Sequence, residues 1–585
     1  MPNRYTAAPA PQLELKPFHA LRMAFRRGYG LADFRADLLA GAVVGVVALP
    51  LSMALAIASG VPPQHGLYTA IVAGGLIALL GGSKVQVSGP TAAFVVILSP
   101  IAHQHGPGGL MVASMLAGIM LMLMGVWRLG RLIEYIPFPV TTGFTSGIAV
   151  VIATLQIRDF LGLSIKQMPD HFTERIAAIV MALPTIHSPD VAIGLTTLTL
   201  LLLVPKLSRR IPAPIIALPA AAILAALLAR CAPGFEVATV QSRFGGIPQS
   251  APMFMLPWMA AGADGAPIAS ALNFDLFRNL LTAAFAIAML GAIESLLSAV
   301  VADGMTGKKH DPDAELLAQG VGNLAAPFFG GFAATGAIAR TATNIRYGAR
   351  SPIAAITHAA FVLVAMLTLA PWLGYLPMAA MAALLLVVAW NMSEIKHFVH
   401  VLRVAPRNDV VVLLLCFGLT VVFDMVIAVT VGVILAALLF IQRMADISGT
   451  RLIAEGHPDL TEKLPPGVML YQIAGPLFFG AAQKAMSALR TVGSGVHVVM
   501  LDLRDVPVMD ATGLVNLEST LDRLHKARVF VVIAGVQDQP LHLMAKAGWK
   551  HRDWLVILRS FDEAMTLART FAASDFGGEG TPNAE

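Results

Sequence analysis

The chain has 585 residues, of which 57% are hydrophobic and only 13% are charged, and its formal net charge is +5. Because soluble proteins carry about 25% charged residues, this composition excludes a wholly soluble protein. In a membrane protein a small basic excess reflects cytoplasmic loops rather than nucleic-acid binding. The two cysteines, Cys231 and Cys416, lie far apart in apolar segments, which indicates neither a disulfide framework nor a metal site.

Apolar stretches long enough to cross about 30 Å of hydrocarbon recur over the first three quarters of the chain. They predict fourteen helical segments, with these bounds: 37–58, 65–81, 90–103, 108–127, 138–158, 189–204, 213–230, 277–302, 312–328, 335–346, 353–371, 376–391, 409–422 and 425–443. A short amphipathic stretch at 172–184 predicts an additional helix that lies along the membrane interface.

Loop charges predict the orientation in the membrane. With the N-terminus inside, the inner loops contain basic residues such as Arg128, Arg131, Lys308 and Lys309. The short outer connection at 59–64 contains no Lys or Arg. Cytoplasmic loops carry the excess of Lys and Arg, so both termini are expected to be cytoplasmic.

Two of the predicted segments are short and begin beside a glycine pair. The segment at 90–103 follows Gly81-Gly82-Ser83-Lys84, and the segment at 335–346 follows Gly330-Gly331. Each takes the third position of a seven-segment half, and interrupted segments at matching positions point to a transporter binding site. Because seven is odd, the halves have opposite topology, which predicts a 7+7 inverted repeat. The alternative is that these glycines only allow close helix packing.

Helices that begin near the middle of the membrane present unbonded N–H groups and the positive end of the helix dipole, which bind anions. Thr91 and Thr335 offer hydroxyl donors at the two starts, and Arg340 places a charge in an apolar segment, where a charge marks a functional site by default. The alternative for Arg340 is a structural ion pair or a snorkelling contact. The predicted substrate-binding residues are Ser88, Gly89, Pro90, Thr91, Thr335, Gly336, Ala337 and Arg340.

Glu294 lies inside the apolar segment at 277–302. A carboxylate in this position can bind and release a proton during transport or help to coordinate a cation. Glu294 is therefore the predicted ion-coupling residue, with Ser298 and Asn323 near it; H⁺ is the expected ion and Na⁺ the alternative. The other interpretation is a static pair with Arg340 or another buried partner. The sequence contains no metal-ligand cluster, nucleophile–base pair or phosphate-binding loop, so no cofactor and no enzymatic activity are expected.

The C-terminal region returns to the composition of a soluble protein and alternates strand and helix patterns. Strands are predicted at 468–473, 498–503 and 529–534, and helices at 478–491, 511–526 and 539–547. Asp510, with Thr512 and Gly513 after it, is well placed as the N-cap of the second of these helices. The predicted organisation is a cytoplasmic N-terminal segment (1–36), a transmembrane transport domain (37–445), a linker (446–466), this small α/β domain (467–572) and a flexible tail (573–585).

The motifs resemble the sulfate permease family, the SulP group related to the SLC26 anion exchangers. The resemblance rests on Pro62-Pro63-Gln64-His65-Gly66-Leu67-Tyr68, where His65 replaces the usual tyrosine, and on the Gly81–Lys84 stretch. The C-terminal region is similar to a STAS domain in Gly475-Pro476-Leu477-Phe478-Phe479 and Asp510-Ala511-Thr512-Gly513. The resemblance implies a mobile core (segments 1–4 and 8–11), a gate (5–7 and 12–14), an elevator-like shift of the core and a homodimer.

Within the family the chain is similar to the DauA-type C4-dicarboxylic acid transporters of bacterial inner membranes, in 49–57, 87–98, 289–297 and 390–394. Leu51 and Leu55 stand where many sulfate- and halide-handling relatives have a glutamine and an aromatic residue. A less polar pocket wall suits a substrate with a carbon backbone. In antisigma-antagonist relatives of the STAS domain the Asp510 motif contains a phosphorylated serine; here Ala511 lacks a hydroxyl and Thr512 keeps one.

The favoured function is proton-coupled symport of C4-dicarboxylates such as succinate, fumarate and aspartate. One alternative is transport of bicarbonate or sulfate with Na⁺ or H⁺. Another is an anion channel or membrane sensor, in which the STAS domain signals and net transport is minor. The STAS domain is also a possible binding site for a regulatory ligand or protein. A channel needs a continuous polar pore, whereas the matched interrupted helices favour a site that can be occluded in the membrane.

Overall fold

A computed structural model describes residues 18–575 except 27, 132–135, 166–167, 170, 209–210, 232–233, 272, 424, 448, 454–463, 488 and 490–494. The chain divides into two compact units, Met1–Val433 and Ile434–Glu585. Much of the predicted linker at 446–466 lies outside the described residues. Residues 1–17 of the predicted N-terminal segment and 576–585 of the predicted tail also lie outside them.

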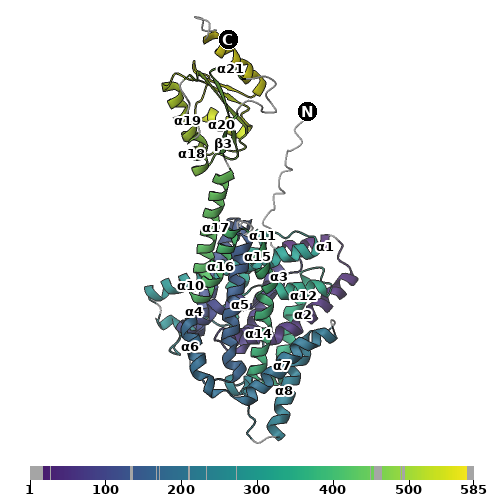
Figure 1. Ribbon diagram of the computed structural model, residues 1–585. Helices are drawn as coiled ribbons and strands as arrows, with labels where there is room; N and C mark the ends of the chain where they lie inside the picture. Colours follow the sequence, from purple (N-terminus) through teal and green to yellow (C-terminus); the bar gives the residue numbers. More distant parts are fainter. Residues whose placement is uncertain are drawn as a thin grey trace. The chain divides into compact units, whose positions relative to one another are not determined.

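The described part of the first unit is a bundle of helices (Figure 1). Its α-helices are α1 (His19–Arg26), α2 (Leu31–Ala58), α3 (Pro63–Leu80), α4 (Ala92–Val126), α5 (Phe138–Leu161), α6 (Phe172–Ala182), α7 (Ser188–Leu207), α8 (Ala213–Cys231), α9 (Val240–Phe244), α10 (Phe274–Thr306), α11 (Pro312–Ala325), α12 (Ile338–Arg346), α13 (Ile353–Leu373), α14 (Met378–Met392), α15 (Ile395–Val404), α16 (Arg407–Val422) and α17 (Met425–Ile447), the last of which continues into the second unit. Short 3₁₀ turns are η2 (Leu183–Thr185), η3 (Pro257–Met259), η4 (Ile268–Ala271) and η5 (Ala326–Phe329), and two short strands are β1 (Ser88–Gly89) and β2 (Thr335–Gly336).

Each predicted membrane segment coincides with one of these helices or with part of one. The segments at 90–103 and 108–127 are the two parts of α4, which is interrupted at Gly106, where φ is 68°. The predicted start at 335 is wrong by three residues, because Thr335 and Gly336 form β2 and α12 begins at Ile338. Among the described residues, ten helices are long and apolar enough to cross a membrane.

The largest helix–helix contacts of the first unit fall into two groups. In one group α2 packs against α3 and α13, and α4 packs against α10 and α11. In the other, α5 packs against α14 and α16, and α7 packs against α8 and α14. The first group corresponds to the core segments of the expected repeat and the second to the gate segments. The short helix α12 contacts α10 and α2 and so belongs to the core group.

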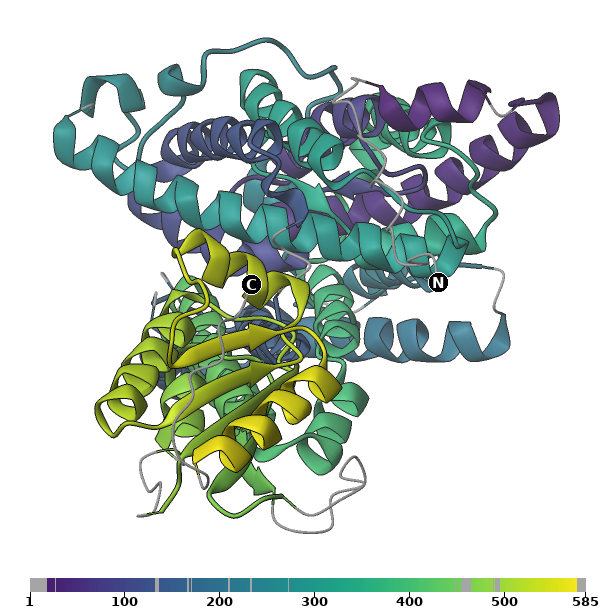
Figure 2. The ribbon, with the colours of Figure 1, turned by 90° about the horizontal axis from the view of Figure 1, so that it is seen from above.

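The second unit is a five-stranded sheet with helices on both faces (Figure 2). The strands are β3 (Gly449–Ile453), β4 (Val468–Ala474), β5 (Val498–Asp505), β6 (Phe530–Ala534) and β7 (Leu555–Leu558), in the order β3-β4-β5-β6-β7, with β3 antiparallel and the other pairs parallel. One sheet face packs against α18 (Phe479–Ser487), α19 (Ala511–Lys526) and α20 (Asp538–Lys546), and the other against α21 (Phe561–Asp575). The predicted strands and helices occur here, and β3, β7 and α21 are additional.

Candidate anion-binding site

The two halves of the first unit meet at the short strands β1 and β2, each of which precedes a core helix. The strands pair antiparallel, with Ser88 opposite Gly336 and Gly89 opposite Thr335. A Cβ atom on Gly336 would collide with Nε2 of Gln86 and lie 3.2 Å from Cα of Ser295. A residue larger than glycine would therefore displace the Gln86 side chain or helix α10. The place where β1 and β2 pair, called the crossing below, thus depends on the absence of a side chain at Gly336.

Helix α10 closes one side of this crossing with hydroxyl and carbonyl groups. The Ser295 hydroxyl accepts a hydrogen bond from the Gly336 N–H (3.2 Å) and lies 2.7 Å from Oγ1 of Thr335. The Thr335 hydroxyl also donates to the Gly291 carbonyl (3.2 Å). The hydroxyl of Thr335 and the amide of Gly336, both predicted to bind substrate, are thus engaged with α10 in this arrangement.

Arg340, in the first turn of α12, points into the same region. Its side chain is almost fully buried, with 3% of the residue exposed. Nη2 donates to the Pro90 carbonyl, whereas Nε and Nη1 have no hydrogen-bond partner among the described residues. A Cβ atom on Gly89 would lie 2.7 Å from Nη1. Because burying an unpaired polar group costs about 1–3 kcal/mol, two unpartnered donor atoms on a buried guanidinium call for an acceptor.

Glu294 also lies on α10, directly before Ser295. Its carboxylate accepts a hydrogen bond from the Thr91 hydroxyl (2.9 Å), and Thr91 is the N-cap of α4. Glu294 and Arg340 are close enough to attract each other. However, they form no ion pair within the described part of the chain, so the static pair considered for these two residues is absent from this arrangement.

The other predicted residues of the site hold the backbone in place. Ser298 lies 3.3 Å from the Thr341 hydroxyl, which accepts the Val87 N–H (3.0 Å). The Ala337 N–H donates to the Val87 carbonyl (2.9 Å). Asn323 donates to the Ala334 carbonyl (2.9 Å) and accepts the Ala334 N–H (2.6 Å). These bonds fix the two backbone segments that lead into β1 and β2.

Sequence reasoning missed a polar stripe on α11 that ends at Asn323. Glu315, fully buried, accepts N–H groups from Gly82 (3.0 Å) and Ser83 (3.1 Å). Gln319 donates both to Glu315 (3.1 Å) and to the Ser88 hydroxyl (2.9 Å). Glu315, Gln319 and Asn323 are spaced four apart and so share one helix face. That spacing was the signal by which the sequence could have revealed the stripe.

In the second unit, Asp510 caps α19, as predicted. Its carboxylate accepts the Gly513 N–H at 2.7 Å. A Cβ atom on Gly513 would collide with the Leu477 carbonyl, which keeps this turn tight. Thr512 is exposed. The motif therefore has a structural role in this unit.

Known proteins resemble the chain over most of its length. Residues 34–416 match the Sulfate permease family, and residues 460–563 match the STAS domain. The chain is 42% identical to the "Putative sulfate transporter YvdB" of Bacillus subtilis, covering 90% of this chain and 96% of that protein. It is 29% identical to the "Bicarbonate transporter BicA" of Picosynechococcus, covering 88% and 91%. In fold it matches the structure of SLC26A9, with a TM-score of 0.80 at 19% identity over 94% of this chain and 92% of that one.

Proposed function

Since the chain belongs to the sulfate permease family of anion transporters and ends in a STAS domain, we propose that it is a secondary active transporter that moves C4-dicarboxylates by proton symport. The substrate would bind at the crossing of β1 and β2, and an elevator-like shift of the core group against the gate group would carry it across the membrane. The chain is a multi-pass membrane protein and not an enzyme.

The observation that carries the proposal is the buried guanidinium of Arg340. Two of its three nitrogen atoms lack a partner among the described residues. A carboxylate or sulfate oxygen fits these donors well, since charge-assisted bonds to a guanidinium are the strong ones. The bond from Nη2 to the Pro90 carbonyl orients the guanidinium toward β1. Arg340 would thus supply the charge that attracts the substrate.

Glu294 would carry the coupled proton. The residue is partly buried, and the Thr91 hydroxyl bonds its carboxylate to the start of α4, which is part of the proposed substrate site. Protonation would remove the attraction between Glu294 and Arg340 and leave the guanidinium to a substrate anion. His358, on α13, is another titratable side chain in electrostatic range of Arg340. His358 variants should therefore be compared with Glu294 variants in any test of proton coupling.

The substrate class rests on Leu51 and Leu55 of α2. Both are apolar and at least partly buried, and a carbon backbone gains from apolar contact where a sulfate ion does not. Sulfate and bicarbonate are the second candidates, because the two relatives described above carry those names. Na⁺ coupling is the corresponding alternative to H⁺.

We also propose a homodimer in which both termini are cytoplasmic. Helix α17 buries little of its apolar surface within the chain, with Ile427, Val431, Ile434, Leu438 and Ile441 all at least 37% exposed. These five residues repeat at alternating spacings of four and three, the pattern that packs two helices along a seam. The exposed Thr512 region of the STAS domain would receive a regulatory ligand or protein.

The test uses purified protein in proteoliposomes, offered labelled succinate, aspartate, sulfate and bicarbonate under separate pH and Na⁺ gradients. The proposal predicts concentrative uptake of succinate driven by an inward proton gradient. Sulfate or bicarbonate uptake without succinate uptake would refute the dicarboxylate assignment. Uptake that follows only the Na⁺ gradient would refute proton symport, but it would still support secondary active transport.

A further inference from the structure

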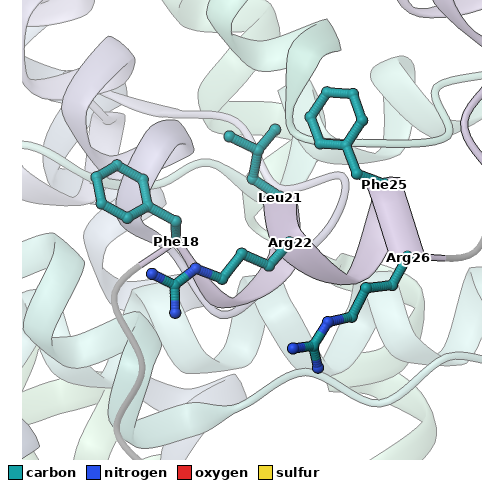
Figure 3. Close-up of a pocket in the computed structure, with 5 residues that line it drawn as sticks. All are labelled: Phe18, Leu21, Arg22, Phe25 and Arg26. Atoms are coloured by element: carbon teal, nitrogen blue, oxygen red, sulfur yellow. The ribbon is translucent and has the colours of Figure 1, made fainter.

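Helix α1 borders a shallow cavity of about 520 Å³, lined by Phe18, Leu21, Arg22, Phe25 and Arg26 (Figure 3). Residues four apart share a helix face. Accordingly, Arg22 and Arg26 leave the helix on one side, and Leu21 and Phe25 leave it on another. Both arginines are exposed, and neither forms an ion pair with an acidic side chain in the described part of the chain. The helix thus offers uncompensated positive charge next to apolar surface.

Two hydrogen bonds hold α1 where the membrane helices end. The N–H of Ala20, which is fully buried, donates to the carbonyl of Gly81, just after α3 ends (3.3 Å). Beyond α1, the Tyr29 hydroxyl donates to Asp37 of α2 (2.8 Å). Burial and this bond raise the pKa of Tyr29 to about 12, so the phenol keeps its proton and the bond at neutral pH. Both α2 and α3 are long and apolar enough to span a membrane, so α1 lies at a membrane surface.

Exposed apolar residues occur on α1 and also at the start of α2, the next helix along the chain. Phe25 is 57% exposed and packs edge-on against Tyr29, with ring centroids 5.4 Å apart. In the first turns of α2, Leu31, Phe34 and Leu38 are 66%, 42% and 48% exposed. Exposed apolar side chains on membrane helices are the part that lipid tails cover. The arginines of α1 border that surface at the level of lipid headgroups.

We infer that α1 binds an anionic phospholipid, with its phosphate between Arg22 and Arg26 and its acyl chain against Leu21 and Phe25. Guanidinium groups bind phosphate through charge-assisted hydrogen bonds. Basic side chains beside a membrane helix are also attracted to the anionic lipids of a cytoplasmic leaflet. The pairing of charge and apolar surface favours a lipid over free phosphate, which would satisfy only the arginines. The inference does not depend on the transported substrate.

The experiment titrates purified full-length protein in detergent with phosphatidylglycerol or phosphatidylcholine and counts bound lipids by native mass spectrometry. The double variant R22Q/R26Q should bind phosphatidylglycerol about 10- to 30-fold more weakly, because each basic residue near an anionic surface contributes a few-fold. R22K/R26K keeps the charge and should retain most of the affinity. The matched control is R403Q/R407Q, which removes two exposed arginines with the same spacing elsewhere on the first unit.

Three results would overturn the inference. The first is equal binding of the two lipids by the wild type. The second is an equal loss of affinity in R22Q/R26Q and R403Q/R407Q, which would reduce the effect to net charge. The third is competition by millimolar inorganic phosphate as effective as that by the lipid, which would make the ligand a free anion. Circular dichroism of each variant verifies that it is folded.

Discussion

Replacing Arg340 by glutamine tests the proposed site most directly. The buried guanidinium has two nitrogen atoms without a partner among the described residues, and a charge-assisted hydrogen bond contributes about 1.5–3 kcal/mol. Losing one such bond to the substrate raises the apparent Kd roughly 10- to 100-fold, at about 1.4 kcal/mol per factor of ten. Arg340→Lys keeps the charge but loses the planar set of donors. Its substrate affinity should therefore fall between that of the wild type and that of R340Q.

The assay is substrate uptake into proteoliposomes over a range of substrate concentrations, with the thermal midpoint of each purified variant measured in parallel. Arg346→Gln is the matched control, because Arg346 lies on the same helix but is exposed. Removing a buried charge also removes its desolvation cost, so R340Q should be at least as heat-stable as R346Q without substrate. An unchanged apparent affinity in R340Q would return Arg340 to a structural role, and so would a loss of affinity that follows a loss of stability.

Three further predictions concern the surroundings of this residue. Glu294→Gln should abolish proton-driven accumulation and leave substrate exchange, measured as counterflow; intact accumulation would exclude Glu294 as the proton carrier. Gly336→Ala should lower the yield and thermal midpoint of the protein, because the new Cβ atom collides with Gln86. The control Gly418→Ala should be tolerated, because no heavy atom lies within 4 Å of the added Cβ atom. Equal thermal midpoints of the two variants would contradict the close packing at Gly336. Glu315→Leu removes the oxygen that accepts the Gly82 and Ser83 N–H groups. Leaving these buried donors unpaired should destabilise the core by about 1–3 kcal/mol in thermal unfolding; a wild-type midpoint would argue against this bonding.

The sequence predicted the helices well because a membrane-spanning helix is a long local run of apolar residues, which needs no information from the rest of the chain. In helix α10, for example, Glu294 is the only charged residue between Leu280 and Ala302, so its charge stands out. The same contrast identified Arg340. The short helix α15 was missed because it is amphipathic and follows directly on α14. The strands β3 and β7 lie at the edges of their sheet, where little in the local pattern separates them from loops.

The details of the site could not be predicted in the same way, because they depend on contacts between residues far apart in the chain. Thr335 was expected at a helix start, but its backbone pairs with Gly89 from the other half. Its hydroxyl was expected to be available, but it bonds to Gly291 and Ser295. The local sequence around Thr335 and Gly336 does not show that they pair with residues of the other half. Their pattern alone was therefore compatible with a helix.

The pairing of β1 with β2 has a consequence for how such a chain can change over evolutionary time. Each half supplies one strand of a two-strand ladder, and Gly336 has room only for the neighbours that the first half places around it. Whether a substitution in one half is tolerated therefore depends on the space that the other half leaves for it. Substitutions at Gln86 and Gly336 are therefore expected to be tolerated together more readily than one at a time.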